Sequence, residues 1–399
     1  MKILIITYYF SPSSIIGAKR WTDFYNLSKK NKDLDLTVLT SNSNGKKVLT
    51  DNIHYIGKEH SFHGGNSFQK KSSLLDIFRH PSLFIRSLDR SIFIPWVKKC
   101  ENWINLNNKN EYDLIISSYG PTASVIVGNY AKKVFNVPFV LDLRDLISIQ
   151  GQKTRLPILH QLDRLFDRFL TRNVDQFLTV SHKCNAKAKA FYNKEASLIY
   201  NGFVNELNLV NSDLSIKNKQ ELKILYMGTL GKNRNPQYIV RILNQYTQKN
   251  PTVKISLSFA SRDNPMDFIK EEDHSNIEIN ILGYLSKEEL SLEKEKSNVF
   301  LLLEDHTSKG DENLTGKIYE YLEEEKPILV SCSNTSDIGK IVKATNTGSI
   351  VSSITELESF IHSKRMRDNE ECKKYSRVNQ YHELKKTLNL LLNKQTQIN

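Results

Sequence analysis

Short apolar runs alternate along the chain with longer segments in which apolar and polar residues are mixed. Near-continuous apolar runs are typical of parallel strands that are buried on both faces. The mixed segments have helical length, so the alternation predicts an α/β fold with a doubly wound parallel sheet. The strands predicted in the first half are Lys2–Thr7, Leu36–Leu39, Leu114–Ser117, Phe139–Asp142, Gln176–Val180 and Ser197–Tyr200.

A second series of the same kind begins after the polar stretch Val204–Gln220, which has the composition of an interdomain linker. Two successive series indicate two Rossmann-like domains, and a length of 399 residues fits two domains. We expect boundaries near residues 205 and 365, followed by a charged, helical tail. The second series predicts strands Lys223–Met227, Val253–Phe259, Ile277–Ile281, Val299–Leu303, Ile328–Ser331 and Ser349–Val351, and helices Gln237–Tyr246, Lys287–Lys296 and Lys317–Glu324.

Composition and charge exclude several classes of protein. The apolar opening, Ile3–Ile6, is too short for a secretory leader, and no apolar run approaches membrane length, so we expect a cytoplasmic protein. Four cysteines without CxxC or metal-ligand spacing predict free thiols in a reducing compartment. The net charge of +12 is spread over the chain without a nucleic-acid motif, so nucleic acid is not an expected partner.

Basic residues are densest between Lys70 and Lys99, where seven Lys or Arg stand against two Asp, with bulky apolar residues between them. Two interpretations stay open. The stretch could lie on an anionic membrane surface, which would place the protein on the inner face of the membrane. Alternatively, it forms helices packed on a domain with solvated charged ends.

A loop of small and turn residues follows the first predicted strand, and Gly17 stands before the next predicted helix. Helix N-termini bind anionic groups, and a glycine lets a ligand approach the backbone. The loop lacks the GxGxxG pattern, so a dinucleotide cofactor is not expected. An ordinary strand-to-helix turn is the alternative interpretation.

The loop Tyr226–Pro236 follows a strand in the second series and contains Gly228, Lys232 and Arg234. Its Asn235-Pro236 pair suits an N-cap followed by a first helical residue. Two cations beside a helix N-terminus predict a pyrophosphate site that needs no metal. A surface turn with solvated charges is the alternative interpretation.

Two carboxylates, Glu312 and Glu320, bracket a segment that leads into a predicted helix and includes Lys317. Carboxylates suit sugar and ribose because they accept hydrogen bonds from vicinal hydroxyls. In isolation, such a pair is also common in a chain with 25% charged residues.

At these residues the chain resembles the glycosyltransferase family 4 enzymes, which have the GT-B fold, and the resemblance covers nearly the whole chain. Glu312 to Glu320 matches the family's E-x7-E motif, which implies that Glu320 holds the nucleotide ribose and Glu312 contacts the donor sugar. The loop at Gly228 is similar to the family's G-R-x4-K phosphate loop. Thr229 replaces the arginine and Arg234 stands where the lysine is expected, while Lys232 compensates for the lost cation.

Ser117–Ser124 and Asp142–Asp145 resemble the S-S-x-P-P and F-R-D signatures of a bacterial branch that builds surface polysaccharides. That branch often has His after the serine aligned with Ser124, where this chain has Val125. Val180-Ser181 and Asn201-Gly202-Phe203 match further landmarks of the family. The expected acceptor contacts come from Arg20, Ser118 and Arg144. Asp145 is a catalytic candidate, or alternatively only caps a helix.

The resemblance implies two facing domains with a central cleft: residues 1–205 bind the acceptor, residues 206–365 bind the nucleotide-sugar, and the tail 366–399 packs back on the first domain. The implied activity is retaining transfer of a hexosyl or N-acetylhexosaminyl group to a saccharide or lipid-linked acceptor in capsule or O-antigen synthesis. The donor is expected to be a UDP-sugar, with no cofactor and no metal. A nucleotide-sugar epimerase of the same fold and a non-catalytic GT-B scaffold are the alternatives.

The expected site residues combine the loops and the resemblance. The catalytic candidates are Glu312, Arg234 and Asp145, and Arg234 would stabilise the leaving pyrophosphate. Donor contacts are expected from Gly17, Gly228, Thr229, Lys232, Arg234, Lys317, Glu312 and Glu320.

Overall fold

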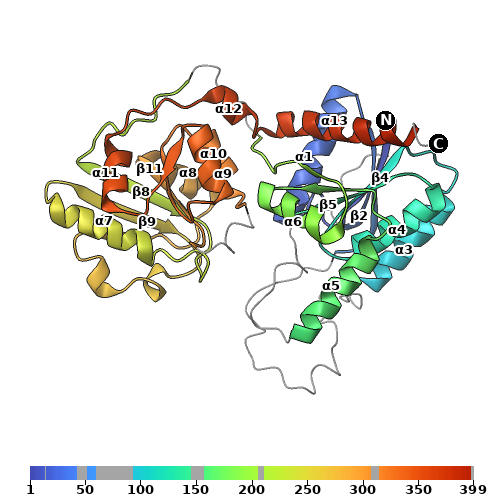
Figure 1. Ribbon diagram of the computed structural model, residues 1–399, viewed down its shortest axis with the longest axis horizontal. Coiled ribbons are helices and arrows are strands. Elements are labelled where there is room, and N and C mark those ends of the chain that lie inside the picture. The colour runs from blue at the N-terminus through green and yellow to red at the C-terminus, as the bar shows by residue number, and fades with distance from the viewer. Residues whose placement is uncertain are drawn as a thin grey trace. The chain divides into compact units, whose positions relative to one another are not determined.

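The computed structural model describes residues 1–13, 15–42, 52–59, 93–144, 157–204, 211–306 and 314–396. The chain divides into two compact units (Figure 1): Met1–Tyr200 with Tyr381–Asn399, and Asn201–Gln380. Each unit has a parallel sheet with helices on its faces, which confirms the predicted α/β fold with two Rossmann-like domains. The two units divide after Tyr200 and after Gln380, whereas the sequence pattern places the boundaries near residues 205 and 365.

In the described part of the first unit, seven parallel strands pair in the order β3-β2-β1-β4-β5-β6-β7. The order reverses between β1 and β4, and ligands of such sheets bind beyond the carboxyl ends of the strands at this switch point. The sequence pattern does not predict β3, an edge strand whose short apolar stretch is interrupted by His54 and ends at Gly57 and Lys58. The strands are β1 (Lys2–Ile6), β2 (Asp35–Asn42), β3 (Ile53–Lys58), β4 (Leu114–Ser118), β5 (Phe139–Leu143), β6 (Gln176–Thr179) and β7 (Ala196–Leu198).

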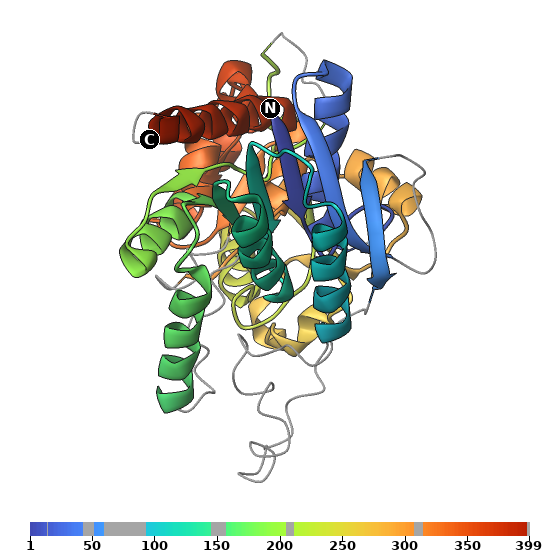
Figure 2. The same cartoon turned by 90° about the vertical axis from the view of Figure 1, so that its right-hand side faces the viewer.

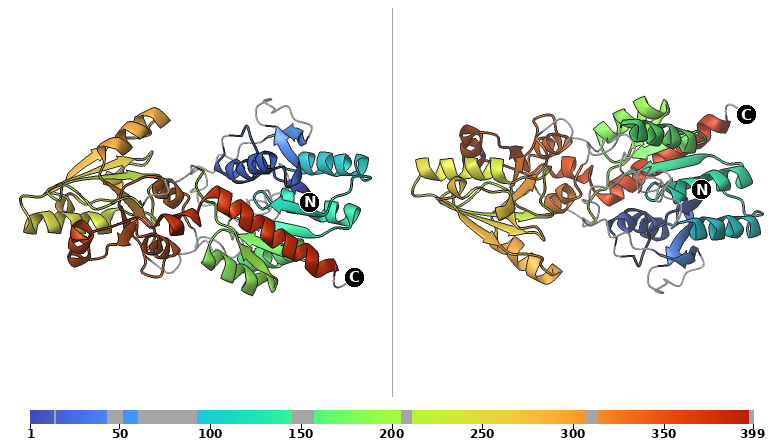
Figure 3. Two further views of the ribbon diagram at one scale, coloured as in Figure 1. Left: turned by 90° about the horizontal axis from the view of Figure 1, so that it is seen from above. Right: turned by 90° about the horizontal axis from the view of Figure 1, so that it is seen from below.

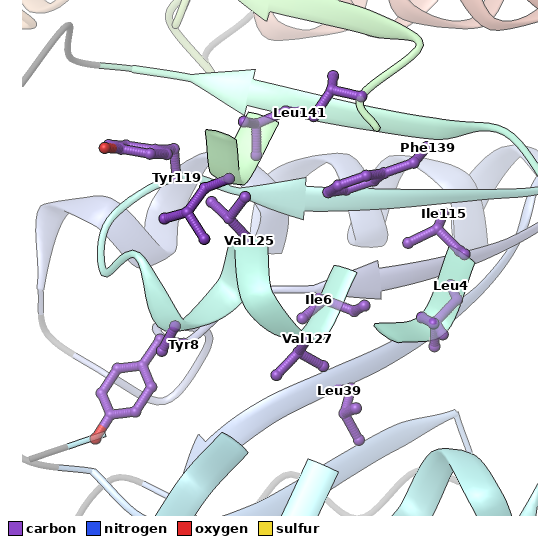
Figure 4. Packing of buried hydrophobic residues seen from close by; sticks show 14 of the residues in the cluster. Leu4, Ile6, Tyr8, Leu39, Ile115, Tyr119, Val125, Val127, Phe139 and Leu141 are labelled. Carbon is purple, nitrogen blue, oxygen red and sulfur yellow. The ribbon is translucent and has the colours of Figure 1, made fainter. Parts of the chain in front are cut away.

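Helices cover both faces of this sheet. They are α1 (Ile16–Asn31), α3 (Ile94–Leu106), α4 (Ala123–Phe135), α5 (Pro157–Thr171), α6 (His182–Tyr192) and the C-terminal α13 (Arg377–Thr396). Successive strand residues point to opposite faces. Leu4 and Ile6 share a buried cluster with residues of α3 to α6, whereas Ile3 and Ile5 pack with α1 and α13. Figure 4 shows part of the first cluster, including Val125 and Val127 of α4. Figures 1 and 2 show α3, α4 and α5 side by side on the first of these faces.

The second unit repeats the arrangement. In its described residues, six parallel strands pair in the order β10-β9-β8-β11-β12-β13, with the reversal between β8 and β11. Its strands are β8 (Glu221–Met227), β9 (Lys254–Ala260), β10 (Glu278–Ile281), β11 (Val299–Leu303), β12 (Ile328–Ser331) and β13 (Gly348–Ile350). Its helices are α7 (Gln237–Lys249), α8 (Lys287–Lys296), α9 (Lys317–Glu323), α10 (Asp337–Ala344), α11 (Ile354–His362) and α12 (Asn369–Lys373).

Packing on the two faces of the second sheet explains where these helices lie. Residues of α7 and α11 pack with alternate residues of β8, β9 and β11 on one face. On the other face, the Tyr321 ring of α9 lies 4.9 Å from Phe300. Its hydroxyl donates to the Leu301 carbonyl at 3.1 Å and accepts from the Met227 N–H at 3.2 Å. This hydroxyl therefore links α9 to β8 and β11.

The sequence pattern predicts a helical C-terminal tail. In the structure this tail is interrupted rather than continuously helical. Backbone groups at Arg365 and Arg367 hydrogen-bond to residues 212–215 instead of forming a helical turn. From Tyr381 onward, α13 lies on the first unit (Figure 3), where Tyr381, Leu384 and Leu388 are buried with residues of α1. None of the helices in the described ranges has the length and apolarity needed to cross a bilayer.

Candidate functional site

The carboxyl ends of β1 and β5 bring Gly17 and Arg144 together in the first unit. Arg144 donates from Nη1 to the Gly17 carbonyl at 2.6 Å. A Cβ atom on Gly17 would lie 2.7 Å from the same nitrogen, so a side chain at this position would displace the guanidinium. Gly17 is in the first turn of α1, one residue inside the helix rather than before it. Because Gly17 has no side chain, a group can approach the backbone closely here, and in the structure that group is the Arg144 guanidinium.

Ser118, at the end of β4, is 1% exposed. Its Oγ atom has no hydrogen-bond partner within the described residues, and the same holds for Ser117 and Ser124. A buried hydroxyl without a partner is costly, so three of them at the switch point of the first sheet mark an unusual polar environment. Asp145 lies outside the described residues.

Arg20 lies in a buried ion pair. Its side chain is 2% exposed and its Nη2 is 3.2 Å from Asp142 Oδ1, in a carboxylate that is itself fully buried. Arg20 also donates to the Tyr200 carbonyl at 2.9 Å, and Asp142 accepts from Trp21 Nε1 at 2.9 Å. These contacts join α1 to β5 and to the end of the first unit's sheet.

In the second unit, the Gly228 loop follows β8 at the switch point. Gly228 has φ +144°, a conformation that strains any residue with a Cβ atom. The Tyr226 hydroxyl donates to the Thr229 carbonyl at 2.7 Å, and the Leu230 N–H donates to Asp263 at 2.8 Å. The loop backbone is therefore fixed from both β8 and the loop that follows β9.

The Arg234 side chain connects this loop to the carboxyl end of β11. Its Nη1 donates to Thr229 Oγ1 at 3.1 Å, and its Nε lies 3.6 Å from Glu304 Oε1. The structure thus brings together Arg234 and Thr229, the two residues that depart from the phosphate-loop pattern of the resemblance. Lys232 is exposed on the same turn. The Asn235 side chain accepts from the Gln237 N–H at 2.9 Å. Helix α7 begins at Gln237, the predicted start, with Pro236 rather than Asn235 at its N-cap position.

Glu304 was not predicted, although a polar triplet directly after a buried strand is a usable signal. The Glu304 side chain is 6% exposed. Burial raises the pKa of its carboxyl to about 7, because burial outweighs the opposing charge of Arg234, and the neighbouring Asp305 also acts to raise it. His306 completes the triplet: its Nε2 lies 3.0 Å from Ser331 Oγ, and burial lowers its pKa.

Stability should depend on the protonation of Glu304. Between its ordinary pKa of 4.5 and about 7, the folded chain holds a proton that the unfolded chain releases. The free energy of unfolding should therefore fall as pH rises through this window, by up to about 1.4 kcal/mol per pH unit from this group. Urea unfolding of the wild type and Glu304→Gln at pH 5, 6, 7 and 8 measures it. The glutamine variant should lack this slope, and parallel pH profiles of the two proteins would contradict the assignment.

The remaining donor candidates lie on α9. Lys317 Nζ and Glu320 Oε2 are 2.8 Å apart, with side chains 34% and 44% exposed, so both are accessible to a ligand. Glu312 lies outside the described residues. In the described ranges, no group of three His, Cys, Asp or Glu side chains is placed to hold a metal ion.

Comparison with protein-family models gives no match, and comparison with curated proteins gives none either. Solved structures do match over nearly the whole chain. Sucrose-phosphate synthase from Thermosynechococcus elongatus has a TM-score of 0.53 and 13% identity, covering 100% of this chain and 98% of that one. Anabaena Alr3699/HepE in complex with UDP-glucose has a TM-score of 0.53 and 16% identity, covering 98% and 99%.

A third similar structure is the apo form of the lipopolysaccharide outer core galactosyltransferase WaaB. It has a TM-score of 0.59 and 12% identity, covering 96% of this chain and 98% of that one. These neighbours are GT-B glycosyltransferases, and their likeness at such low identity establishes the fold. The chain therefore has the two-domain GT-B fold.

Proposed function

We propose that the chain is a glycosyltransferase that moves a sugar from a nucleotide-diphosphate sugar to a saccharide acceptor. The observation that carries the proposal is the cluster of Arg234, Thr229 and Glu304 at the β8–β11 switch point of a GT-B fold. Ligands of open α/β sheets bind at such a point. The similar HepE structure contains UDP-glucose, and similar WaaB is a galactosyltransferase, which supports a UDP-sugar donor.

The second unit would hold the donor. Gly228 brings the backbone close to the ligand, and Arg234, Lys232 and the N-terminus of α7 supply positive charge for the diphosphate. The charge that develops on the leaving nucleotide diphosphate would be stabilised by Arg234. Its Nε faces Glu304 and its Nη1 donates to Thr229, so two contacts orient the guanidinium before the donor binds. Glu320 would hold the ribose and Glu312 the donor sugar.

The first unit would bind the acceptor. Arg144 and Ser118 lie at the carboxyl ends of neighbouring strands, where an acceptor hydroxyl could be recognised. From the sequence resemblance, we propose transfer with retained anomeric configuration, without a metal, to a saccharide or lipid-linked acceptor in capsule or O-antigen synthesis. A lipid-linked acceptor would place the protein at the inner face of the membrane. Asp145 is the acceptor-side catalytic candidate.

The test is release of nucleotide diphosphate from a panel of nucleotide-sugars, with and without a lipid-linked saccharide acceptor, in the presence and absence of EDTA. A transferase releases the nucleotide in an acceptor-dependent manner, and the metal-free mechanism predicts that EDTA has no effect. Isomerisation of the donor sugar without acceptor would identify an epimerase. Donor binding with neither reaction, or no binding, would identify a scaffold.

Replacing the two proposed donor-site carboxylates one at a time should affect nucleotide binding and turnover separately. Glu320→Ala should weaken nucleotide binding by about 1.5–3 kcal/mol, roughly 10- to 150-fold in Kd, because a charge-assisted hydrogen bond to ribose is lost. Glu312→Ala should chiefly lower kcat. Titration calorimetry with UDP and steady-state kinetics measure the two effects. Glu293→Ala, which removes a carboxylate paired with Lys296 on α8, is the control and should change neither.

A further inference from the structure

Helix α5 of the first unit presents an apolar stripe to the outside. Leu162, Leu165 and Phe169 are 45%, 62% and 54% exposed. Their spacing of three and four residues places them on one face of the helix. A single exposed apolar side chain is ordinary, whereas three on one face of a helix form a continuous apolar surface.

The charges of α5 are sorted between its two faces. Its acids point inward: Asp163 is 2% and Asp167 0% exposed, and Asp167 accepts from the hydroxyls of Tyr119 and Tyr192 at 3.2 and 2.6 Å. Arg164, Arg168 and Arg172, in contrast, are exposed at one-turn intervals. Within residues 160–172, the exposed charged side chains are therefore all basic.

These arginines are held in place by aromatic rings. Arg164 and Arg168 lie over the Phe191 ring of α6, with the guanidinium carbon 5.0 and 4.5 Å from its centroid. Arg172 lies 4.0 Å over the Phe169 ring. A guanidinium stacked on a ring presents N–H groups at its edge that can donate to a phosphate. Because stacking already restricts the arginine side chain, less conformational entropy is lost when a phosphate binds.

We propose that the outward face of α5 docks on an anionic phospholipid surface. Leu162, Leu165 and Phe169 would enter the boundary between head groups and acyl chains, and the three arginines would contact lipid phosphates. The charge sorting favours this occupant, because an anionic surface complements a face that combines an apolar stripe with charged groups that are all basic. Figures 1 and 2 show α5 at the edge of the first unit, beside α4. The proposal does not rest on the sugar transfer reaction.

The test is sedimentation of the full chain with vesicles of phosphatidylcholine alone or with added phosphatidylglycerol. The wild type should sediment with the anionic vesicles only, and less at high salt. Leu165→Asn/Phe169→Asn should abolish this binding. Arg164→Gln/Arg172→Gln should weaken it roughly 30-fold, since each basic residue contributes a factor of about five. Lys29→Gln/Lys30→Gln removes the same charge from α1, on the opposite face of the sheet, and should bind as the wild type does.

Several results would overturn the proposal. One is wild-type binding by the Leu165→Asn/Phe169→Asn variant, and another is loss of binding only when Arg79, Arg86 and Arg90 are changed to Glu, which would assign docking to the Lys70–Lys99 stretch. A third is a lower unfolding temperature, or dissociation of an oligomer, in the Leu165→Asn/Phe169→Asn variant. Either result would mean that the apolar stripe is covered by protein. Donor-dependent nucleotide release with a water-soluble acceptor should be the same in every α5 variant, so failure of docking is distinguishable from failure of the proposed function.

Discussion

Arg234→Ala should lower kcat/KM for sugar transfer roughly 10- to 150-fold, the equivalent of about 1.5–3 kcal/mol for lost charge-assisted hydrogen bonds. The side chain lies at the β8–β11 switch point and is oriented by Thr229 and Glu304. Steady-state kinetics of acceptor-dependent nucleotide release measures the loss. Arg234→Lys keeps the charge but not the guanidinium geometry, so it should recover only part of the rate.

A matched control lies on the helix that follows the loop. Arg241 of α7 forms a surface ion pair with Asp273 at 2.9 Å, and Arg241→Ala should leave kcat/KM unchanged. Arg234→Ala should also leave the buried Glu304 carboxylate without its cation, so the variant should lose more stability between pH 6 and pH 8 than the wild type does. Adding Glu304→Gln should restore stability without restoring activity. Full activity in Arg234→Ala would exclude this arginine from the proposed donor site.

Arg20→Ala should reduce the free energy of unfolding of the first unit by about 3–5 kcal/mol, because it leaves the buried Asp142 carboxylate without its cation. Urea unfolding followed by circular dichroism measures this change. Lys19→Ala, an exposed neighbour on α1, is the control and should change stability by less than about 0.5 kcal/mol. Replacing both partners, as Arg20→Met with Asp142→Asn, should cost less than Arg20→Ala alone.

The Arg20→Ala variant distinguishes between two roles of this arginine, acceptor binding and structural support. The sequence resemblance predicts contact with the acceptor, whereas the structure places the side chain between Asp142, Tyr200 and the ring of Phe24. Wild-type stability with a raised KM for the acceptor would support the binding role. Loss of stability with an unchanged KM among the molecules that remain folded would support the structural role.

Local sequence determined most of the fold. The strands Val299–Leu303 and Ile328–Ser331 and the helix Lys287–Lys296 have the predicted bounds, because buried apolar runs and a capping box at Ser286 are local signals. The Gly228 loop could also be predicted, since its glycine, cations and helix start are contiguous in the chain. Strand β3 could not, because an edge strand lacks the continuous apolar run of a buried one.

Tertiary structure alone decided which distant residues share a site. The reversal of strand order places β11 beside β8, and this pairing brings Glu304 to Arg234. Burial of the Glu304 carboxyl at this position raises its pKa, against the opposing charge of Arg234. The partner of Arg20 likewise depends on how α1 packs on β5. The rotation of α5 on its sheet decides that its acids are buried and its arginines exposed, although both alternate along the same sequence. Periodicity specifies that a helix has faces, whereas the neighbours it packs against specify which face is buried.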